Sequence, residues 1–230
     1  MLRLGIGVVV LPTPKSHSFH TVYGKSFDER MLRVLSVAEP FNASDIDYCP
    51  NAKYIYMGPL TTNDFSLESM RRASEKAPVV LDVQGFTRLV VEDRIEYVDW
   101  GWKKDGLRYT SIFKADIREA EILTKTRDPV KASEILASWG PTEILITSNE
   151  GLHLRAGNDI FFAPFVVDEV RGRVGRGDTC LASYLHARLK GMGYEDAVKF
   201  AAAATSLKLR YQGPLREGEV EVMTFLKQYL

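Results

Sequence analysis

The chain has 230 residues, of which 45% are hydrophobic and 26% charged, and its 30 basic and 30 acidic side chains leave no net charge. This length suits one domain, or one domain with a small appendage, and the composition is that of a soluble globular protein. The charge balance argues against a nucleic-acid or membrane-surface partner, and no apolar run is long enough to span a membrane. Two distant cysteines, Cys49 and Cys180, predict a reducing, cytoplasmic compartment, and scarce glutamine is in keeping with a thermophile.

The chain order of the predicted elements indicates an α/β protein. The first forty residues predict strands and turns, with β-like runs at 6–12 and 30–37. Further strands are expected at 52–58, 78–85, 111–116 and 142–147, a short strand or helix lead at 94–100, and a hairpin at 152–165. Helices are expected at 66–77, 118–126, 128–140, 178–193, 194–210 and 216–230. This alternation predicts a mainly parallel sheet covered on both faces, with ligands at the carboxyl ends of its strands.

The stretch GRVGRGDTCLASYL, residues 172–185, places glycines and an aspartate ahead of an apolar run. In one interpretation Asp178 only caps a helix and the glycines only form a turn. In the other, Gly175, Arg176 and Gly177 present backbone N–H groups to a phosphate, and Asp178 accepts a proton from a substrate hydroxyl. Taken alone, the stretch favours the capping interpretation.

Polar residues at three predicted strand ends point to a phosphate-handling site. Asp116 and Glu119 are suited to a hydrated Mg²⁺ on a nucleotide, although helix capping alone is their commoner role. Thr147 precedes a Ser-Asn-Glu-Gly turn at 148–151, which suits nucleotide phosphates or ribose, or else a plain hairpin connection. Residues 82–88 follow a third strand.

The remaining charged candidates lie in two loops. Asp82, Gln84 and Arg88 are placed to hold polyol hydroxyls, or only to satisfy their own loop. Three arginines close to the glycine turn either screen a triphosphate or form a solvated face: Arg171, Arg173 and Arg176.

The motifs and their order along the chain resemble the ribokinase/PfkB family of carbohydrate kinases, and the resemblance covers most of the chain. The family's Gly-Ala-Gly-Asp turn reads Gly175 to Asp178 here, and its Asn-x-x-Glu reads Asp116 to Glu119. Its nucleotide turn is present, altered and one residue shorter, at 147–151, and its Asp-x-Asn-x-Arg loop resembles 82–88. Its alanine-rich late helix and following glycine resemble 197–213.

The resemblance implies a three-layer α/β/α sandwich with a mainly parallel sheet and a small β lid. Residues 1–40 would supply part of the lid and the sheet entry, and 41–230 the nucleotide-binding and catalytic core, as a single domain overall. The implied reaction is ATP- and Mg²⁺-dependent phosphorylation of a sugar or polyol hydroxyl. The GRGDTC and LDVQG variants resemble the myo-inositol kinase-like subgroup.

The resemblance also implies a role for each site residue. Asp178 would be the base, with an anion hole over Gly175, Arg176, Gly177 and the Asp178 N–H, and Glu119 would help to place Mg²⁺. The implied substrate contacts are Asp82, Gln84 and Arg88. The implied nucleotide contacts are Thr147, Ser148, Asn149, Gly151, Asp116, Ala202 and Gly213.

Departures from the family pattern leave alternatives open. Arg176 replaces an alanine, so its bulk is expected to point away from the phosphate, and Gly172-Arg173 replaces an Asp-Thr pair that helps to hold a monovalent cation. The family's first strand and its sugar-binding Gly-Gly turn have no counterpart, which predicts exposed strand edges and dimerisation or poor solubility.

Two other functions therefore remain beside the kinase of sugars or polyols. One is a nucleotide-binding remnant without catalysis, suggested by the front of the chain. The other is a nucleoside or vitamin-precursor kinase, with Phe86, Trp100 and Trp102 as candidate stacking residues.

Overall fold

The computed structural model describes residues 5–23 and 30–230. The strands are β1 (Ser18–Tyr23), β2 (Arg30–Ser36), β3 (Ile55–Met57), β4 (Val79–Asp82), β5 (Arg88–Val91), β6 (Arg94–Tyr97), β7 (Ile112–Asp116), β8 (Glu143–Thr147), β9 (Gly151–Ala156) and β10 (Asp159–Pro164). The α-helices are α1 (Leu67–Lys76), α2 (Lys103–Leu107), α3 (Ile117–Thr124), α4 (Pro129–Ala137), α5 (Arg176–Leu189), α6 (Tyr194–Leu209) and α7 (Glu219–Tyr229). Short 3₁₀ helices are η2 (Ala43–Tyr48) and η3 (Val83–Thr87).

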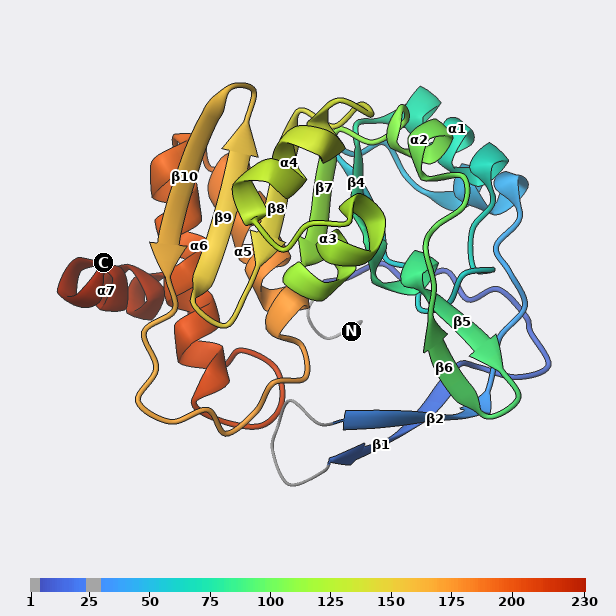
Figure 1. Cartoon of the computed structure of the whole chain (residues 1–230), viewed down its shortest axis with the longest axis horizontal. Helices are drawn as coiled ribbons and strands as arrows, with labels where there is room; N and C mark the ends of the chain where they lie inside the picture. The colour runs from blue at the N-terminus through green and yellow to red at the C-terminus, as the bar shows by residue number, and fades with distance from the viewer. Residues whose placement is uncertain (1–4, 24–29) are drawn as a thin grey trace.

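A six-stranded sheet with the order β10-β9-β8-β7-β4-β3 forms the centre of the molecule (Figure 1). Strands β3, β4, β7 and β8 run parallel, and the β8–β9–β10 meander is antiparallel. The inner strands are apolar on both faces, as strands covered from both sides must be. The mainly parallel sheet and the hairpin predicted at 152–165 are thus confirmed.

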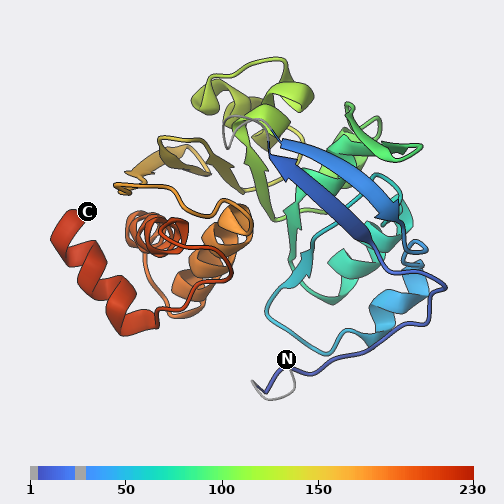
Figure 2. The ribbon, with the colours of Figure 1, turned by 90° about the horizontal axis from the view of Figure 1, so that it is seen from below.

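Helices cover both faces of this sheet. Alternate residues of one strand enter different cores, so Val80 packs with α5, α6 and α7 while Leu81 packs with α1, α3 and α4. In Figure 1, α3 and α4 lie in front of the sheet and α5 and α6 behind it. Figure 2 shows the orange and red C-terminal helices on one side of the molecule and blue β1 and β2 on the other. The layers are therefore helix, sheet and helix, as expected.

A second sheet of four strands, in the order β1-β2-β6-β5, lies beside the central one. It combines the predicted strand at 30–37 with residues 88–97, which come from the region after residue 40. The strand predicted at 6–12 is wrong, because these residues form no ladder with any described strand. Val8, Val9 and Val10 are exposed there, so β-branched residues alone did not make a strand.

The topology brings three polar strand ends to one edge of the central sheet. Asp82 ends β4, Asp116 ends β7 and Thr147 ends β8. Asp82 is in register with Lys114, and Asp116 is in register with Thr147, so the three ends are neighbours. In the described part of the chain, no helix combines the length and the apolar character needed to cross a membrane.

Candidate active site

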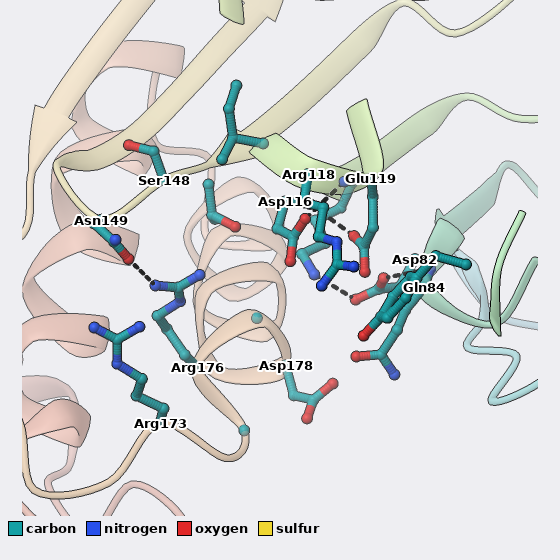
Figure 3. A pocket seen from close by; sticks show the side chains of 16 residues that line it. Asp82, Gln84, Asp116, Arg118, Glu119, Ser148, Asn149, Arg173, Arg176 and Asp178 are labelled. Carbon is teal, nitrogen blue, oxygen red and sulfur yellow. Dashed lines mark hydrogen bonds and ion pairs between the residues drawn. The ribbon is translucent and has the colours of Figure 1, made fainter. Parts of the chain in front are cut away.

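A cavity of about 250 Å³ opens at this edge of the sheet, where α3 and α5 begin. Its wall is formed almost wholly by polar and charged side chains and by glycine backbone. Figure 3 shows Arg173, Arg176 and Asn149 on one side of Asp178, and Asp82 and Gln84 on the other. Eleven of the predicted site residues line it: Asp82, Gln84, Asp116, Glu119, Thr147, Ser148, Asn149, Gly175, Arg176, Gly177 and Asp178.

Helix α5 begins without a side-chain cap. Its N-cap is Gly175, which has a φ of 81°, a left-handed conformation that favours glycine. Asp178 is the third residue of the helix, so the interpretation of Asp178 as an N-cap is wrong. Among the residues that the structure describes, its carboxylate has no hydrogen-bond or ion-pair partner. This carboxylate is therefore available to a substrate in the cavity.

Two backbone N–H groups at the start of α5 are open to the cavity. The Arg176 N–H already donates to the Arg173 carbonyl, 3.1 Å away, and the Thr179 N–H donates to the Gly175 carbonyl. The N–H groups of Gly177 and Asp178 have no acceptor within the described ranges. An anion at this helix start would meet these two groups and the positive end of the helix dipole.

A buried ion pair lies directly beside the turn. Lys114 Nζ is 2.9 Å from Asp82 Oδ2, and both side chains are buried. A Cβ at Gly177 would lie 2.5 Å from Lys114 Nζ, so only glycine lets α5 approach this closely. Burial lowers the pKa of Lys114, but Asp82 and Glu119 raise it more strongly, so the ammonium stays charged. Both partners line the cavity, and the Asp82 carboxylate balances the charge of the Lys114 ammonium.

Helix α3 begins with a reciprocal cap. The Asp116 carboxylate accepts from the Glu119 N–H at 2.8 Å, and the Glu119 carboxylate accepts from the Asp116 N–H at 2.7 Å. The capping interpretation of these two residues is therefore confirmed, and both also line the cavity. Burial, followed by the charge of Asp116, raises the pKa of Glu119 to about 7. Two crowded carboxylates of this kind favour a nearby cation.

These two carboxylates fit a magnesium ion only with help from a substrate. In the described residues, no group of three or more acidic, histidine or cysteine side chains is arranged around a common point. Mg²⁺, however, commonly takes one or two protein carboxylates and completes its shell with water and substrate phosphates. Asp116 and Glu119 each use one oxygen in the cap, which leaves the other oxygen for such a role.

The end of β8 and the turn that follows it form another part of the cavity wall. Thr147 is buried, and within the described part of the chain its Oγ1 has no hydrogen-bond partner. Ser148 Oγ accepts from the N–H groups of Glu150 and Gly151, which closes the turn. A buried hydroxyl without a partner is uncommon, and here it is next to the cavity, where a ligand oxygen can satisfy it.

Three guanidinium groups line the same cavity. Arg176 Nη1 donates to Asn149 Oδ1 at 3.2 Å, so the side chain lies on the Asn149 side of the cavity (Figure 3). The expectation that its bulk points away from the phosphate stays a prediction. Arg118 stacks on the Tyr97 ring at 3.8 Å, which joins α3 to the small sheet, and Arg173 completes the set. The cavity can therefore hold a ligand with several negative charges.

Comparison with known proteins agrees with this geometry. The sequence profile of the pfkB family carbohydrate kinases matches residues 28–217. The chain belongs to the PfkB family. It is accordingly a carbohydrate kinase, a phosphotransferase, and both the predicted family and the predicted enzyme class are confirmed.

Solved structures are similar to this PfkB kinase over nearly its whole length. One is a sulfate complex of a pyrophosphate-dependent kinase in the ribokinase family, 36% identical, which covers 96% of this chain and 79% of its own at a TM-score of 0.89. Another is a pyrophosphate-dependent myo-inositol-1 kinase converted to a myo-inositol-3 kinase, which is 33% identical. It covers 99% of this chain and 78% of its own length at a TM-score of 0.86.

A more distant structure supports the fold alone. The ribokinase of Thermotoga maritima is 17% identical and covers 98% of this chain and 74% of its own at a TM-score of 0.75. The ribokinase-like fold predicted from the sequence is confirmed. No curated protein matches the chain.

Four predicted contacts of the PfkB kinase lie outside the cavity. Arg88 is buried at the start of β5, and Ala202 is buried within α6. Gly151 begins β9, where a Cβ would lie 2.3 Å from the Ala163 carbonyl oxygen, and Gly213 follows α6 in open space. None of the four lines the cavity wall.

The aromatic residues proposed for ring stacking pack against one another instead. Phe86 and Trp100 stack with ring centres 4.4 Å apart, and Trp102 meets both rings edge-on. Phe86 and Trp100 are buried in the core beneath α1 and α3. The feature that suggested a nucleoside acceptor is therefore part of the core.

Four cavity residues were not proposed as site residues from the sequence: Tyr97, Lys114, Ile117 and Arg118. Lys114 carried a signal, because it is the one charged residue inside the apolar strand predicted at 111–116. A charge in a strand that is covered on both faces must be paired, and a cavity is where pairing is most often functional.

Proposed function

We propose that this kinase transfers a phosphoryl group from pyrophosphate to a hydroxyl of a cyclic polyol of the myo-inositol class. Three solved kinases that are 33–36% identical to this chain are pyrophosphate-dependent, and two of them bind or phosphorylate myo-inositol. The expected donor from the sequence was ATP, and ATP stays as the second candidate because the turn after β8 occupies the place of the family's nucleotide turn.

The arginine-rich side of the cavity is the observation that carries the choice of donor. Arg173 and Arg176 lie there with Asn149, and Arg118 lines the cavity beside Asp116 and Glu119 (Figure 3). Three of the seven residues expected to contact a nucleotide are outside the wall: Gly151, Ala202 and Gly213. A donor without a nucleoside must obtain its affinity from its phosphates alone. Guanidinium groups serve this purpose because they form paired hydrogen bonds to phosphate oxygens.

The other side of Asp178 suits the acceptor. Asp82 and Gln84 offer two carboxylate oxygens and an amide next to the Asp178 carboxylate (Figure 3). A ring that carries a hydroxyl on every carbon presents both donors and acceptors to such a surface. Asp82 is held in place by Lys114 and by the Gln84 N–H at 3.1 Å, so it is a rigid partner.

Phosphoryl transfer then needs only small proton movements. Asp178 accepts the proton of the attacking polyol hydroxyl. The hydroxyl oxygen of the polyol at the same time forms a bond to one phosphorus of pyrophosphate. The bond from that phosphorus to the bridging oxygen breaks, and inorganic phosphate leaves toward the arginines. The N–H groups of Gly177 and Asp178 hold the transferring group, whose charge grows in the transition state. Asp178 afterwards releases its proton to solvent.

Asp116 and Glu119 are the residues that would hold Mg²⁺ in this scheme. When bound, the ion would neutralise part of the charge on the pyrophosphate oxygens. The capping hydrogen bonds fix both carboxylates at the start of α3, so the two side chains are ordered before any ligand binds.

The direct test presents the purified chain and Mg²⁺ with either pyrophosphate or ATP, against a panel of inositols, sugars and nucleosides. Mass spectrometry of the phosphorylated product gives the same readout for both donors. We expect an inositol phosphate from pyrophosphate and little from ATP. Transfer from ATP alone would replace the donor, transfer to a nucleoside would replace the acceptor, and donor binding without product would indicate a remnant.

A pair of variants separates the arginine argument from general charge. In Arg176→Ala the KM for pyrophosphate should rise about tenfold or more, because a charge-assisted contact to phosphate is lost. Arg171→Ala is the matched control, because this arginine belongs to the same loop but pairs with Glu169 at 2.8 Å outside the cavity. Equal effects of the two variants would contradict a specific role for Arg176.

A further inference from the structure

Lys208 is a buried lysine that the proposed mechanism does not use. It lies in the last turn of α6 and is 0% exposed. The other buried residues of this helix are mostly alanine and leucine. Fully buried lysines are rare because removing an ammonium from water is costly unless something offsets its charge. The position of Lys208 therefore calls for an explanation.

The ammonium has one direct partner, a backbone carbonyl. Lys208 Nζ donates to the Gly172 oxygen at 2.7 Å. Among the described residues it forms no ion pair with a carboxylate, and burial lowers its pKa. A neutral carbonyl satisfies one of its three N–H groups but offsets little of its charge.

The carbonyl belongs to the segment that enters the glycine turn. The N–H groups of Arg171 and Gly172 both donate to the Leu209 carbonyl, so this segment rests on the end of α6. A Cβ at Gly172 would lie 2.3 Å from the Tyr211 carbonyl oxygen, which shows how closely the two backbones approach. Lys208 is thus directly behind the turn.

The distance to the anion-binding groups is short. A Cβ placed on Gly175 would lie 3.8 Å from Lys208 Cε and 3.9 Å from Asp178 Oδ2. The lysine approaches the N-cap of α5 from inside the protein, while the cavity lies on its other side. Its charge is screened there by protein rather than by water, so its field at the turn is strong.

We infer that Lys208 is a positioning residue for the donor: its ammonium fixes the turn at Gly172–Gly175 and supplies positive charge whose counter-ion is the bound phosphate. The inference rests on the proposed function, since it needs a phosphate at the start of α5. It differs from a purely structural role, in which the lysine only satisfies the Gly172 carbonyl and the negative end of α6.

Two substitutions separate charge from hydrogen bonding. Lys208→Met removes both, whereas Lys208→Gln keeps an N–H donor in place of the ammonium. The matched control is Lys76→Met, because Lys76 Nζ also donates to backbone carbonyls, those of Ile46, Asp47 and Cys49, away from the cavity. Lys208→Met and Lys76→Met both lose carbonyl contacts, but only the two Lys208 variants lose the charge behind the turn.

Calorimetric titration with pyrophosphate gives the deciding readout. We expect the Kd to rise about tenfold or more in both Lys208 variants and to stay unchanged in Lys76→Met. The KM for the polyol should stay nearly constant, because the charge acts on the donor. Thermal unfolding should show a lower Tm for Lys208→Met and Lys76→Met alike, which reports the structural part separately.

The outcomes divide clearly. An unchanged Kd in Lys208→Gln, or Lys208 variants that cannot be recovered folded, would assign the lysine to folding alone and overturn the inference. Wild-type protein that binds ATP but not pyrophosphate would overturn the proposed donor only, and the same ratio of Kd values would then be measured with ATP. Wild-type protein that binds neither would overturn both.

Discussion

Two helices begin at the same cavity, and they treat their first turns in opposite ways. At α3 the Asp116 and Glu119 carboxylates accept the N–H groups of the helix start, so protein charge meets the helix dipole. At α5 the N-cap is Gly175, which has no side chain to offer, and the N–H groups of Gly177 and Asp178 stay open. One helix start is closed by the chain, and the other is left for a ligand.

This difference separates two acidic patterns that look alike in a sequence. Asp116 and Asp178 each lie near a predicted helix start, yet one is a cap and the other is the third residue of its helix. The capped start presents spare carboxylate oxygen, which suits a cation. The open start presents N–H groups, which suit an anion. Together they can hold a phosphate and its counter-ion side by side.

The largest expected effect comes from Asp178→Asn. With no proton acceptor, kcat should fall about 10²- to 10⁴-fold, while the Tm and the Kd for pyrophosphate stay nearly constant. The control is Asp128→Asn, because Asp128 is a true N-cap of α4 and asparagine caps equally well. Undiminished turnover in Asp178→Asn would remove this residue from the role of base.

Gly177→Ala tests whether the open start depends on close packing. The new methyl group would lie 2.5 Å from Lys114 Nζ, so the Lys114–Asp82 pair must shift. Such overpacking costs about 1–3 kcal/mol of folding stability, and we expect pyrophosphate affinity to fall at least about tenfold. Gly193→Ala, at the N-cap of α6 where a Cβ meets open space, should leave affinity unchanged. Equal affinities in the two variants would contradict this account.

Asp116→Ala tests the closed start. Loss of an N-cap side chain costs about 1 kcal/mol, which lowers the Tm by about 2–4 °C in a domain of this size. No substitution of the same kind is available at α5, because Gly175 caps nothing through a side chain. A Tm unchanged in thermal unfolding would mean that water replaces the cap at no cost.

The smallest expected effect concerns the buried side of α5. Burial raises the pKa of the Cys180 thiol to about 11. At pH 8 only about one thiol in a thousand is then the reactive thiolate, since alkylation requires loss of the proton. Iodoacetamide should label Cys49, which is partly exposed, and should spare Cys180 until the protein unfolds. Rapid labelling of Cys180 in a Cys49→Ser variant, counted by mass spectrometry, would show that this side of α5 opens to water.

The sequence predicted the central layers well because its signals there are local. Buried strands such as 142–147 contain a short apolar run, here Ile144 to Ile146, and each ends at a polar residue that the parallel topology brings to one edge. The small sheet was harder to predict, because β6 pairs with β2, which lies more than fifty residues earlier in the chain. Residues 6–12 had strand propensity but no partner strand among the described residues, and propensity alone does not form a ladder.

Within the site, the sequence predicted most of the residues that line the cavity but not the supporting charges. Asp178 and Glu119 are parts of local motifs, whereas Lys114 and Lys208 act through contacts 32 and 36 residues away in the chain. Whether a buried lysine faces a carboxylate or a carbonyl depends on packing that no local pattern encodes. Those residues became visible only when the strands and helices were assembled.

The arrangement around Asp178 has a stereochemical consequence. Arg173 and Arg176 lie on one side of this carboxylate and Asp82 and Gln84 on the other, with the sheet edge behind them (Figure 3). Such a setting has no mirror plane. A meso ring such as myo-inositol has hydroxyls that are mirror images of each other and equally reactive in water. Held between these two sides, only one of each pair would face the donor, so an achiral polyol would leave as a single enantiomer of its phosphate.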